Sequence, residues 1–514
     1  MTAWTIGAVL DAIADVIPDR LMTMCGTRRT TFAEARTRTR ILANYLSDQG
    51  FGVVIGCLKA RAVPVSVNHH YSPGEIRDLL EYLGPRGIIY HRLLGARFAE
   101  VLPESGTELM ASIDDGSAVP ELSGAVSLND ALAVGCADRD VEGSPDDLIM
   151  MCTGGTTGQP KRVLWRQSDM YVASMTGADH RSVEEIHRQV RAGGQPWFAV
   201  SPLMHAGGMW TAFAAFLNGL PVVLYEDRNK LDARSVWATA EREKVSMATM
   251  VGGAYAGTLV AELRAHPYDL SSLNAIGSGG ATTSAKYKRA LMECLPPITT
   301  IEGFGSFATG NMAFGYSSNG AASDTFAPGA GTAVVSADRS RLLRPGEPGI
   351  GWTARTGRIP LAYFNDAVAT QRTFPEIDGR RVAIPGDRAT VEKAGSIRLL
   401  GRDSLVVNTG GEKVFVEEVE EELRTHPDID DALVIGRRSE RWGQQVVALI
   451  ARHPGSDVVA DEALYNHCTS RLAHFKAPKA FIFVDQIPHL GNGKPNCRWA
   501  RQAAVQRLPV KGSA

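Results

Sequence analysis

The sequence predicts an α/β fold with a large N-terminal domain of doubly wound sheets and a small mobile α+β C-terminal domain. Three observations lead to this prediction. The chain has 514 residues, which is too long for one hydrophobic core. Strand-like apolar runs alternate with helical segments through most of the chain. Near residue 400 a polar bend precedes a compact stretch of about a hundred residues, the size of a small domain.

The domain boundaries follow from this change of pattern. We expect an N-terminal domain over residues 1–401, a hinge over residues 402–404, and a C-terminal lid domain over residues 405–514.

The composition is that of a globular protein, with 44% hydrophobic and 21% charged residues. Its formal net charge is −2, so no strong field attracts nucleic acid or an anionic membrane. No apolar run is long enough to span a bilayer, and the seven cysteines form no CxxC pair. We therefore expect a cytoplasmic protein that binds no nucleic acid and has no membrane span.

The expected elements begin with an amphipathic helix in residues 1–20, which lacks the basic start and cleavage site of a secretory signal. A strand is expected over residues 63–67. The next helix begins with Ser72 as N-cap, Pro73 at its first position and Glu75 as the capping-box partner. Further strands are expected at residues 87–90, 148–151, 197–200, 221–225, 247–251 and 396–400, and a helix with one acidic side at residues 417–423.

Residues 151–161, Met-Cys-Thr-Gly-Gly-Thr-Thr-Gly-Gln-Pro-Lys, form a loop suited to polyphosphate. Glycines bring backbone N–H groups close to phosphate oxygens, hydroxyls donate hydrogen bonds, and Lys161 adds a positive charge. The loop follows an expected buried strand, and α/β folds place ligands at the carboxyl ends of strands. Taken alone, it also fits an ordinary turn rich in Gly and Thr, and it is not a Walker loop because Lys161 follows Pro160. Cys152 is expected to be a small buried filler rather than a nucleophile.

Several later segments follow this loop in a fixed order. They are Pro202-Leu203-Met204-His205, Gly279-Gly280-Ala281, Gly303-Phe304-Gly305-Ser306, Gly386-Asp387, Gly401-Arg402, Asn408-Thr409-Gly410-Gly411-Glu412-Lys413 and Pro488-His489-Leu490-Gly491-Asn492-Gly493-Lys494. Together with the loop they resemble the adenylate-forming superfamily of acyl-CoA synthetases, peptide-synthetase adenylation domains and luciferases. The resemblance covers nearly the whole chain and is strongest to the subgroup that handles steroid side-chain and long-chain acids.

The resemblance implies ATP and Mg²⁺ as cofactors and a role for each matching residue. The loop residues Thr153, Gly154, Gly155, Thr156, Thr157, Gly158 and Lys161 would hold the β- and γ-phosphates. The adenine pocket would be formed by Gly279, Gly280 and Ala281, with Phe304 of the segment Phe304-Gly305 stacked on the base. Asp387 would pair with the ribose hydroxyls, and Arg402 would lie near ribose and phosphate. His205 would lie beside the substrate carboxylate, and Lys494 would offset negative charge that develops in the transition state.

Three departures from the family pattern bear on function. Phe307 and Ala308 stand where the family has a small hydroxyl residue and a magnesium-binding glutamate. We hypothesise that Glu302 or Thr309 compensates, because magnesium prefers oxygen ligands and keeps several waters. The ring of Phe307 also fills space in the substrate pocket, so a smaller or unusual oxyacid becomes conceivable.

The other two departures concern Arg162 and a gap. Arg162 replaces the usual glycine; its side chain either adds charge near the phosphates or points to solvent, and we expect it to point to solvent. After residues 44–52 the chain continues directly into residues 53–60, where the family has a strand and the start of a helix. A missing strand would expose a sheet edge, which a neighbouring copy in a homodimer could cover.

The sequence leaves three functional hypotheses open. The leading one is an AMP-forming ligase that activates a carboxylic acid, releases pyrophosphate and transfers the acyl group to a nucleophile, with CoA as the default acceptor. An alternative is adenylation of a non-carboxylate oxyacid such as nitrite, which would diazotise an aromatic amine. A third hypothesis, motivated by Ala308, is a degenerate nucleotide-binding protein without activity.

Overall fold

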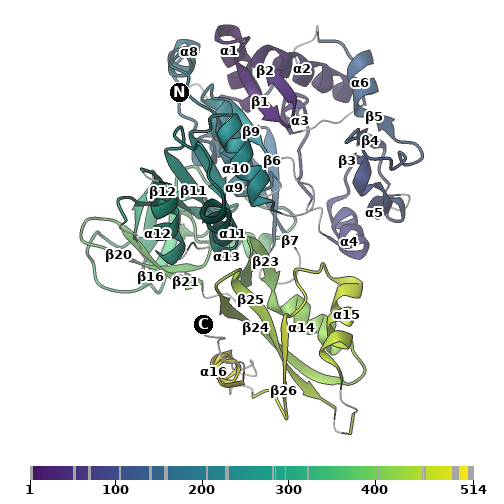
Figure 1. Cartoon of the computed structure of the whole chain (residues 1–514), viewed down its shortest axis with the longest axis vertical. Coiled ribbons are helices and arrows are strands. Elements are labelled where there is room, and N and C mark those ends of the chain that lie inside the picture. The colour runs from purple at the N-terminus through teal and green to yellow at the C-terminus, as the bar shows by residue number, and fades with distance from the viewer. Residues whose placement is uncertain are drawn as a thin grey trace.

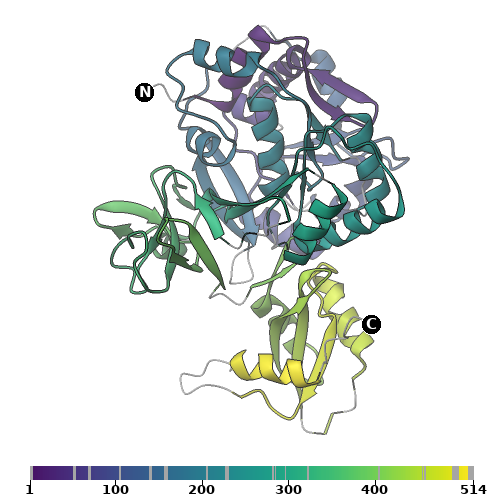
Figure 2. The same ribbon diagram turned by 60° about the vertical axis from the view of Figure 1, so that its left-hand side comes forward.

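The structure is a computed structural model of the chain. It describes residues 4–49, 54–67, 71–102, 106–137, 142–154, 160–203, 206–225, 231–280, 283, 285–295, 297–320, 323, 325–402, 406–453, 455–456, 459–488 and 497–507. A large N-terminal part carries a smaller C-terminal part, and both combine helices with sheets (Figures 1 and 2). The predicted α/β fold class is confirmed.

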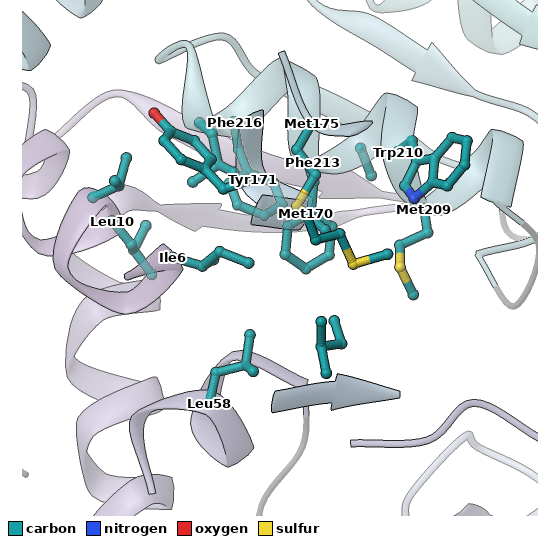
Figure 3. Close-up of a cluster of buried hydrophobic side chains, with 14 of the residues drawn as sticks. Ile6, Leu10, Leu58, Met170, Tyr171, Met175, Met209, Trp210, Phe213 and Phe216 are labelled. Carbon is teal, nitrogen blue, oxygen red and sulfur yellow. The ribbon is translucent and has the colours of Figure 1, made fainter. Parts of the chain in front are cut away.

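Helix α1 (Ile6–Val16) confirms the predicted N-terminal amphipathic helix. Thr5 caps it, its hydroxyl accepting a hydrogen bond from the backbone N–H of Ala8 at 3.0 Å. The apolar face of α1 packs into a core cluster with residues of α7 (Gln167–Ser174) and α9 (Ala206–Leu217), which Figure 3 shows. This cluster covers one face of the main sheet.

The main sheet has a parallel part in which six strands lie in the order β12-β11-β10-β8-β9-β1. Their bounds are β1 (Leu21–Cys25), β8 (Trp197–Ala199), β9 (Val222–Leu224), β10 (Met247–Met250), β11 (Ala275–Ser278) and β12 (Thr299–Ser306). The second face of this part is covered by α10 (Ala233–Arg242), α11 (Gly252–Ala265) and α12 (Ala285–Cys294), whose buried side chains share one core cluster with the strands. Helices thus cover both faces, as the doubly wound prediction requires.

The sheet continues into an antiparallel part. Its strands are β13 (Gly310–Ser317), β14 (Thr325–Pro328), β15 (Thr332–Val335), β16 (Gly351–Thr356), β18 (Glu376–Ile377), β19 (Arg380–Ala383), β20 (Asp387–Val391) and β21 (Ile397–Arg402), with α13 (Ala367–Thr373) before β18.

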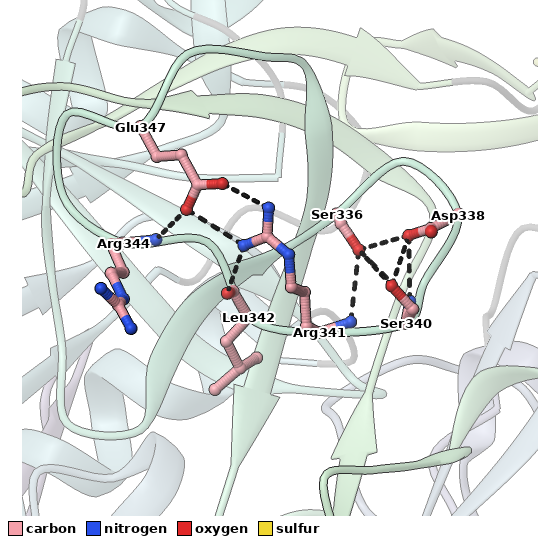
Figure 4. A network of polar contacts seen from close by, with 7 residues as sticks. All are labelled: Ser336, Asp338, Ser340, Arg341, Leu342, Arg344 and Glu347. Atoms are coloured by element: carbon pink, nitrogen blue, oxygen red, sulfur yellow. Dashed lines mark hydrogen bonds and ion pairs between the residues drawn. The ribbon is translucent and has the colours of Figure 1, made fainter.

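A polar network orders the long connection between β15 and β16 (Figure 4). Arg341 pairs there with Glu347, and the hydroxyls of Ser336 and Ser340 donate to Asp338. These hydroxyl donors lower the pKa of the Asp338 carboxyl to about 2. Charge pairs and hydrogen bonds therefore order the polar side of this connection, while Leu342 and Leu343 pack against small core clusters.

Two smaller sheets complete the N-terminal part. One has the order β17-β7-β6, from β6 (Leu148–Gly154), β7 (Pro160–Arg166) and β17 (Ala362–Tyr363); the other is parallel, with β3 (Gly87–His91), β4 (Leu109–Ile113) and β5 (Val126–Ser127). The remaining elements here are β2 (Arg28–Thr31), α2 (Phe32–Gln49), α3 (Val54–Lys59), α4 (Pro73–Leu83), the 3-10 helix η1 (Arg92–Leu94), α5 (Gly95–Ala99), α6 (Leu128–Val134) and α8 (Val183–Arg191).

The helix predicted from Ser72 is α4, and its capping box is present in full: Ser72 Oγ accepts from the N–H of Glu75, and Glu75 Oε2 accepts from the N–H of Ser72 at 2.9 Å. The predicted strand over residues 63–67 is wrong. Only an isolated bridge forms there, between Val65 and Met150. Pro64 has no N–H, which weakens pairing in this segment.

The chain after the predicted gap forms α3, which packs against α2, where the side chain of Leu42 approaches Gly56. Strand β3 is the edge of its sheet and pairs with β4. Whether the gap exposes a sheet edge that a neighbouring copy covers in a homodimer stays a prediction.

The C-terminal part is a five-stranded sheet in which β23-β22-β25-β24 are neighbours and β26 pairs with β25. Its elements are β22 (Val406–Thr409), β23 (Glu412–Phe415), α14 (Val416–Arg424), β24 (Ile429–Ser439), β25 (Gly443–Arg452), α15 (Asp461–Arg471), β26 (Ala480–Val484) and α16 (Cys497–Arg507). The helix predicted at residues 417–423 is α14.

The lid, as we call residues 406–507, has helices on both faces of its sheet. Alternate residues of β24 point to opposite sides: Val434 packs towards α14 and α15, whereas Leu433 and Ile435 pack towards α16. Figure 1 accordingly shows α16 across the sheet from α14 and α15. Strand β21 ends at Arg402, the first residue of the predicted hinge, and β22 begins at Val406.

Candidate active site

The candidate site lies at the carboxyl edge of the parallel strands. Registers place Met250 beside Ser278 and Ser278 beside Glu302, so β10, β11 and β12 reach the same edge together. The predicted adenine-pocket residues Gly279 and Gly280 follow β11 directly. The sequence motifs are thus brought to the edge where α/β sheets bind ligands.

The adenine-pocket turn is held by hydrogen bonds that the sequence analysis did not identify. Gly280 has a φ of +79°, a conformation that favours glycine. The N–H of Thr283 donates to Glu302 Oε1 at 3.0 Å, and the hydroxyls of Thr283 and Ser278 lie 2.7 Å apart. Ala281 falls outside the described residues. Glu302 therefore supports the turn from the neighbouring strand.

Glu302 is also paired on its second oxygen. Lys288 Nζ lies 2.5 Å from Glu302 Oε2, and both side chains are nearly buried. Thr309 is fully buried; its hydroxyl accepts from the N–H of Ser306 at 3.0 Å and lies 3.1 Å from the carbonyl oxygen of Gly310. In this conformation, protein groups already engage the oxygens of both residues that we proposed as magnesium ligands. Within the described part of the chain, no group of three His, Cys, Asp or Glu side chains is placed to hold a metal.

The segment predicted to stack on adenine adjoins this turn. The Phe304 ring is half-buried, with its centre 6.0 Å from that of Phe326. An added Cβ at Gly305 would overlap the carbonyl oxygen of Gly310, and the β12–β13 register shifts between Phe304 and Gly305. A β-bulge therefore requires glycine at position 305 and changes the direction of the strand next to the Phe304 ring.

The divergent pair Phe307 and Ala308 packs into the core beside α9. The Phe307 ring meets the Trp210 ring edge-on, with centres 5.8 Å apart, and the Phe307 carbonyl accepts a hydrogen bond from Trp165 Nε1 at 2.7 Å. Ala308 is 6% exposed. Helix α9 begins at Ala206, directly after the predicted substrate-side His205, which lies outside the described residues together with Met204. Two aromatic rings therefore stand next to the expected acid site.

The phosphate loop connects the two strands of a hairpin. Strand β6, predicted at residues 148–151, extends to Gly154, and β7 begins at Pro160. Thr153 faces Lys161 in the register, and Lys161 Nζ lies 4.8 Å from the centre of the Tyr363 ring. Residues 155–159, and with them Gly155, Thr156, Thr157 and Gly158, fall outside the described residues. The loop's framework is defined, and its contacts with phosphate stay a prediction.

Burial raises the pKa of the Cys152 thiol to about 12, which fits the predicted filler rather than a nucleophile. The expectation that Arg162 points to solvent is wrong. Its side chain is 1% exposed, stacks on the Tyr82 ring, and donates from Nη1 to the Tyr82 carbonyl at 2.7 Å. Burial lowers its pKa to about 10. Successive residues of a strand point to opposite sides, so Arg162 faces away from the side of Lys161.

The residues predicted for ribose recognition are neighbours. Asp387, at the start of β20, is the direct register partner of Arg402, at the end of β21. Gly386 precedes it with a φ of +99°. The predicted acid and arginine therefore stand side by side where the chain passes into the lid.

The lid places the tip of its first hairpin against the carboxyl edge of the main sheet. Gly410 and Gly411 form the turn between β22 and β23, with φ of +59° and +89°. An added Cβ on Gly411 would overlap Val251 Cγ1, and Val251 follows β10. The hairpin that carries the segment Asn408–Lys413 thus lies over the candidate site, whereas Lys494 lies outside the described residues. Helix α16, which follows Lys494 in the chain, packs on the lid face opposite α14 and α15 (Figure 2).

Comparison with known proteins places the chain in a family. The family model "AMP-binding enzyme" matches residues 10–357, and "AMP-binding enzyme C-terminal domain" matches residues 418–494. The chain belongs to the AMP-binding enzyme family. This AMP-binding enzyme is an adenylate-forming ligase, as its motifs predicted.

Relatives agree with this assignment, and a solved structure agrees with the fold. The medium-chain acyl-CoA ligase Mig of Mycobacterium avium is 40% identical over 98% of this chain and 99% of its own. The 3-oxocholest-4-en-26-oate–CoA ligase of Rhodococcus rhodochrous is 32% identical over 97% and 96%. The amide bond synthetase McbA from Marinactinospora thermotolerans superposes with a TM-score of 0.77 at 18% identity, over 96% and 99% of the two chains, which supports the fold.

The AMP-binding enzyme shows no helix long and apolar enough to cross a bilayer in the part of the chain that the structure describes. Its site also contains residues that motif reasoning missed, namely Lys288, Thr283 and Trp210. Lys288 and Thr283 form their contacts through tertiary packing, and neither stands in a recognisable motif. Trp210 could have been suspected, because a large aromatic residue near the start of the helix after His205 has to face the acid site or the core.

Proposed function

We propose that the protein is an ATP-dependent acyl-CoA ligase. In the first half-reaction a carboxylate oxygen attacks the α-phosphorus of ATP, forming an acyl adenylate and releasing pyrophosphate. In the second, the thiol of CoA attacks the acyl carbon, forming the thioester and releasing AMP. The observation that carries this proposal is the full-length likeness to two acid–CoA ligases, at 40% and 32% identity.

The acid that we propose is a medium-chain fatty acid, with steroid side-chain acids as the next class. The more similar of these two relatives is named for medium-chain acids and the other for a steroid acid. The edge-on pair Phe307–Trp210 supports an apolar wall beside the expected carboxylate position. Nothing in the comparisons favours nitrite or an inactive protein.

The chain's own residues would divide the work of adenylation. The phosphate loop with Lys161 would hold the triphosphate, Phe304 would stack on adenine, and Asp387 would accept hydrogen bonds from the ribose. Lys494 would stabilise charge on the attacking and bridging oxygens. Magnesium would neutralise phosphate charge, and triphosphate oxygens and water would supply most of its ligands, because Glu302 and Thr309 already have protein partners.

We further propose that this structure represents the lid position for transfer to CoA. The Gly410–Gly411 turn contacts the carboxyl edge of the main sheet beside Val251. The helix that follows Lys494 packs on the other face of the lid sheet. Adenylation would then require the lid to rotate about residues 402–404, which brings Lys494 to the ATP site.

The test is a substrate panel with the full chain. Octanoate, palmitate, a steroid side-chain acid, and nitrite with an arylamine are each incubated with ATP, Mg²⁺ and CoA. AMP release and the mass of the thioester are measured. The proposal predicts AMP and an acyl-CoA, highest with octanoate. AMP release only with nitrite and the amine would refute it.

A further inference from the structure

The lid contacts the N-terminal part at a second place, the beginning of α4. Lys476, in the connection between α15 and β26, donates from Nζ to Glu418 Oε1 of α14 at 2.8 Å and pairs with Glu75 Oε1 of α4. Only 7% of the Lys476 side chain is exposed. Nearby, the hydroxyl of Ser72 donates to the carbonyl of Arg471 at 2.8 Å. Two contacts of the lid therefore meet at the N-terminus of one helix.

The capping box of α4 holds the Glu75 carboxylate in place for this contact. Its Oε2 accepts from the N–H of Ser72 at 2.9 Å, which leaves Oε1 for Lys476. At the other end of α4, Arg162 of β7 binds the Tyr82 carbonyl and stacks on its ring. The carboxylate is thus fixed relative to the strand that carries Lys161, and little side-chain entropy is lost when Lys476 arrives.

Lys476 has one carboxylate partner within the lid and one outside it, so its ion pairs depend on the position of the lid. Glu418 and Lys476 are both in the lid and can stay paired when it moves, whereas Glu75 can reach Lys476 only in the present position. Glu418 Oε2 is buried and has no hydrogen-bond partner among the described residues, and burial raises the pKa of its carboxyl. Without the lysine, two carboxylates would face each other in a nearly dry interface, which is strongly unfavourable.

We propose that Glu75 and Lys476 form a latch that holds the lid in the transfer position, with Glu418 orienting the ammonium group. We class Glu75 and Lys476 as positioning residues, which act by stabilising one of the two lid positions. This proposal rests on the proposed function, because it assigns the latched position to the second half-reaction.

The test measures the half-reactions separately in the full chain. The variants are Glu75→Gln, which keeps a cap acceptor, Lys476→Met, and the double variant. The matched control is Lys59→Met, because Lys59 is similarly buried and pairs at 2.6 Å with Asp11, within the N-terminal part. We expect each latch variant to slow thioester formation from preformed acyl adenylate by about tenfold, with acid-dependent pyrophosphate exchange unchanged or faster. The double variant should be no slower than the singles, since one interaction is lost.

Lys59→Met should leave the rates of both half-reactions unchanged or change them by the same factor. Unchanged transfer in both single variants, or losses that add in the double variant, would overturn the latch. A parent enzyme without pyrophosphate exchange for any acid would instead overturn the proposed function.

A distance measurement tests the latch independently of activity. Spin labels are placed at Val134→Cys and Val505→Cys, which are 78% and 67% exposed, in a chain in which the exposed Cys136 is replaced by serine. The population with the label separation of this structure should fall in the Glu75→Gln variant. An unchanged distance distribution would contradict the latch even if the enzyme activates no acid tried.

Discussion

Substitution of Gly411 by alanine should separate the two half-reactions. The residue has a φ of +89°, which costs an L-residue about 1 kcal/mol in either lid position. A new Cβ would also overlap Val251 Cγ1, and rotating the buried valine to move Cγ1 away would press its methyl groups against the residues packed around it. Val251 is 6% exposed and packed, so the lid has to retreat.

The size of the effect follows from that overlap. Overpacking typically costs about 1–3 kcal/mol, which corresponds to a rate loss of about 5- to 150-fold for the step that needs this lid position. Single-turnover transfer from preformed octanoyl adenylate to CoA should fall by such a factor in Gly411→Ala, while pyrophosphate exchange changes little.

Two variants serve as controls. In Gly410→Ala, which also has positive φ, the new Cβ meets Trp442 of the lid itself at 2.8 Å, so any cost is independent of lid position. In the double variant Gly411→Ala/Val251→Ala the overlapping methyl group is absent, and transfer should recover. Equal losses in both half-reactions, or no recovery in the double variant, would refute the assignment of this lid position to transfer.

Three further predictions address the site and the core. Glu302→Gln should raise the KM for ATP by about tenfold, because it weakens the hydrogen bond from Thr283 and the ion pair with Lys288 that support the adenine-pocket turn. The Mg²⁺ dependence of the rate should not change. A change in Mg²⁺ dependence with an unchanged KM for ATP would instead identify Glu302 as a metal ligand. Phe307→Ala removes the ring that packs on Trp210 and should shift kcat/KM towards bulkier acids, and an unchanged acid preference would place Phe307 outside the pocket. Burial lowers the pKa of His180, so this residue takes up a proton on unfolding, and stability should fall as the pH drops below about 6.5. Thermal unfolding between about pH 5 and 8 should show a smaller slope in His180→Gln, and an equal slope would exclude His180 as the cause.

The fold was predictable from sequence where local signals agree with tertiary packing. The N-terminal helix, the capping box of α4 and the strands at residues 197–200, 221–225 and 247–251 all carry such signals, and the structure contains them. The strand expected at residues 63–67 fails because an apolar run says nothing about a partner strand, and here the pairing stops at one bridge. The domain boundaries stay a prediction.

Only those residues of the site that lie in recognisable sequence motifs could be predicted. Register brings Gly279 to the edge that β12 reaches, and it sets Asp387 opposite Arg402. Arg162 was misplaced because its surroundings, Tyr82 and the turn after β17, come from distant parts of the chain. The contact between Lys476 and Glu75 could not be predicted for the same reason. Glu75 is remote from Lys476 along the chain, and its sequence context indicates only a helix cap.

The most direct test of adenylation is the exchange of labelled pyrophosphate into ATP in the presence of octanoate. The account predicts exchange that requires the acid and Mg²⁺ in the parent enzyme and falls by about a hundredfold or more in Lys494→Ala. Absence of exchange with every acid of the panel, or equal exchange in the parent enzyme and Lys494→Ala, would contradict it.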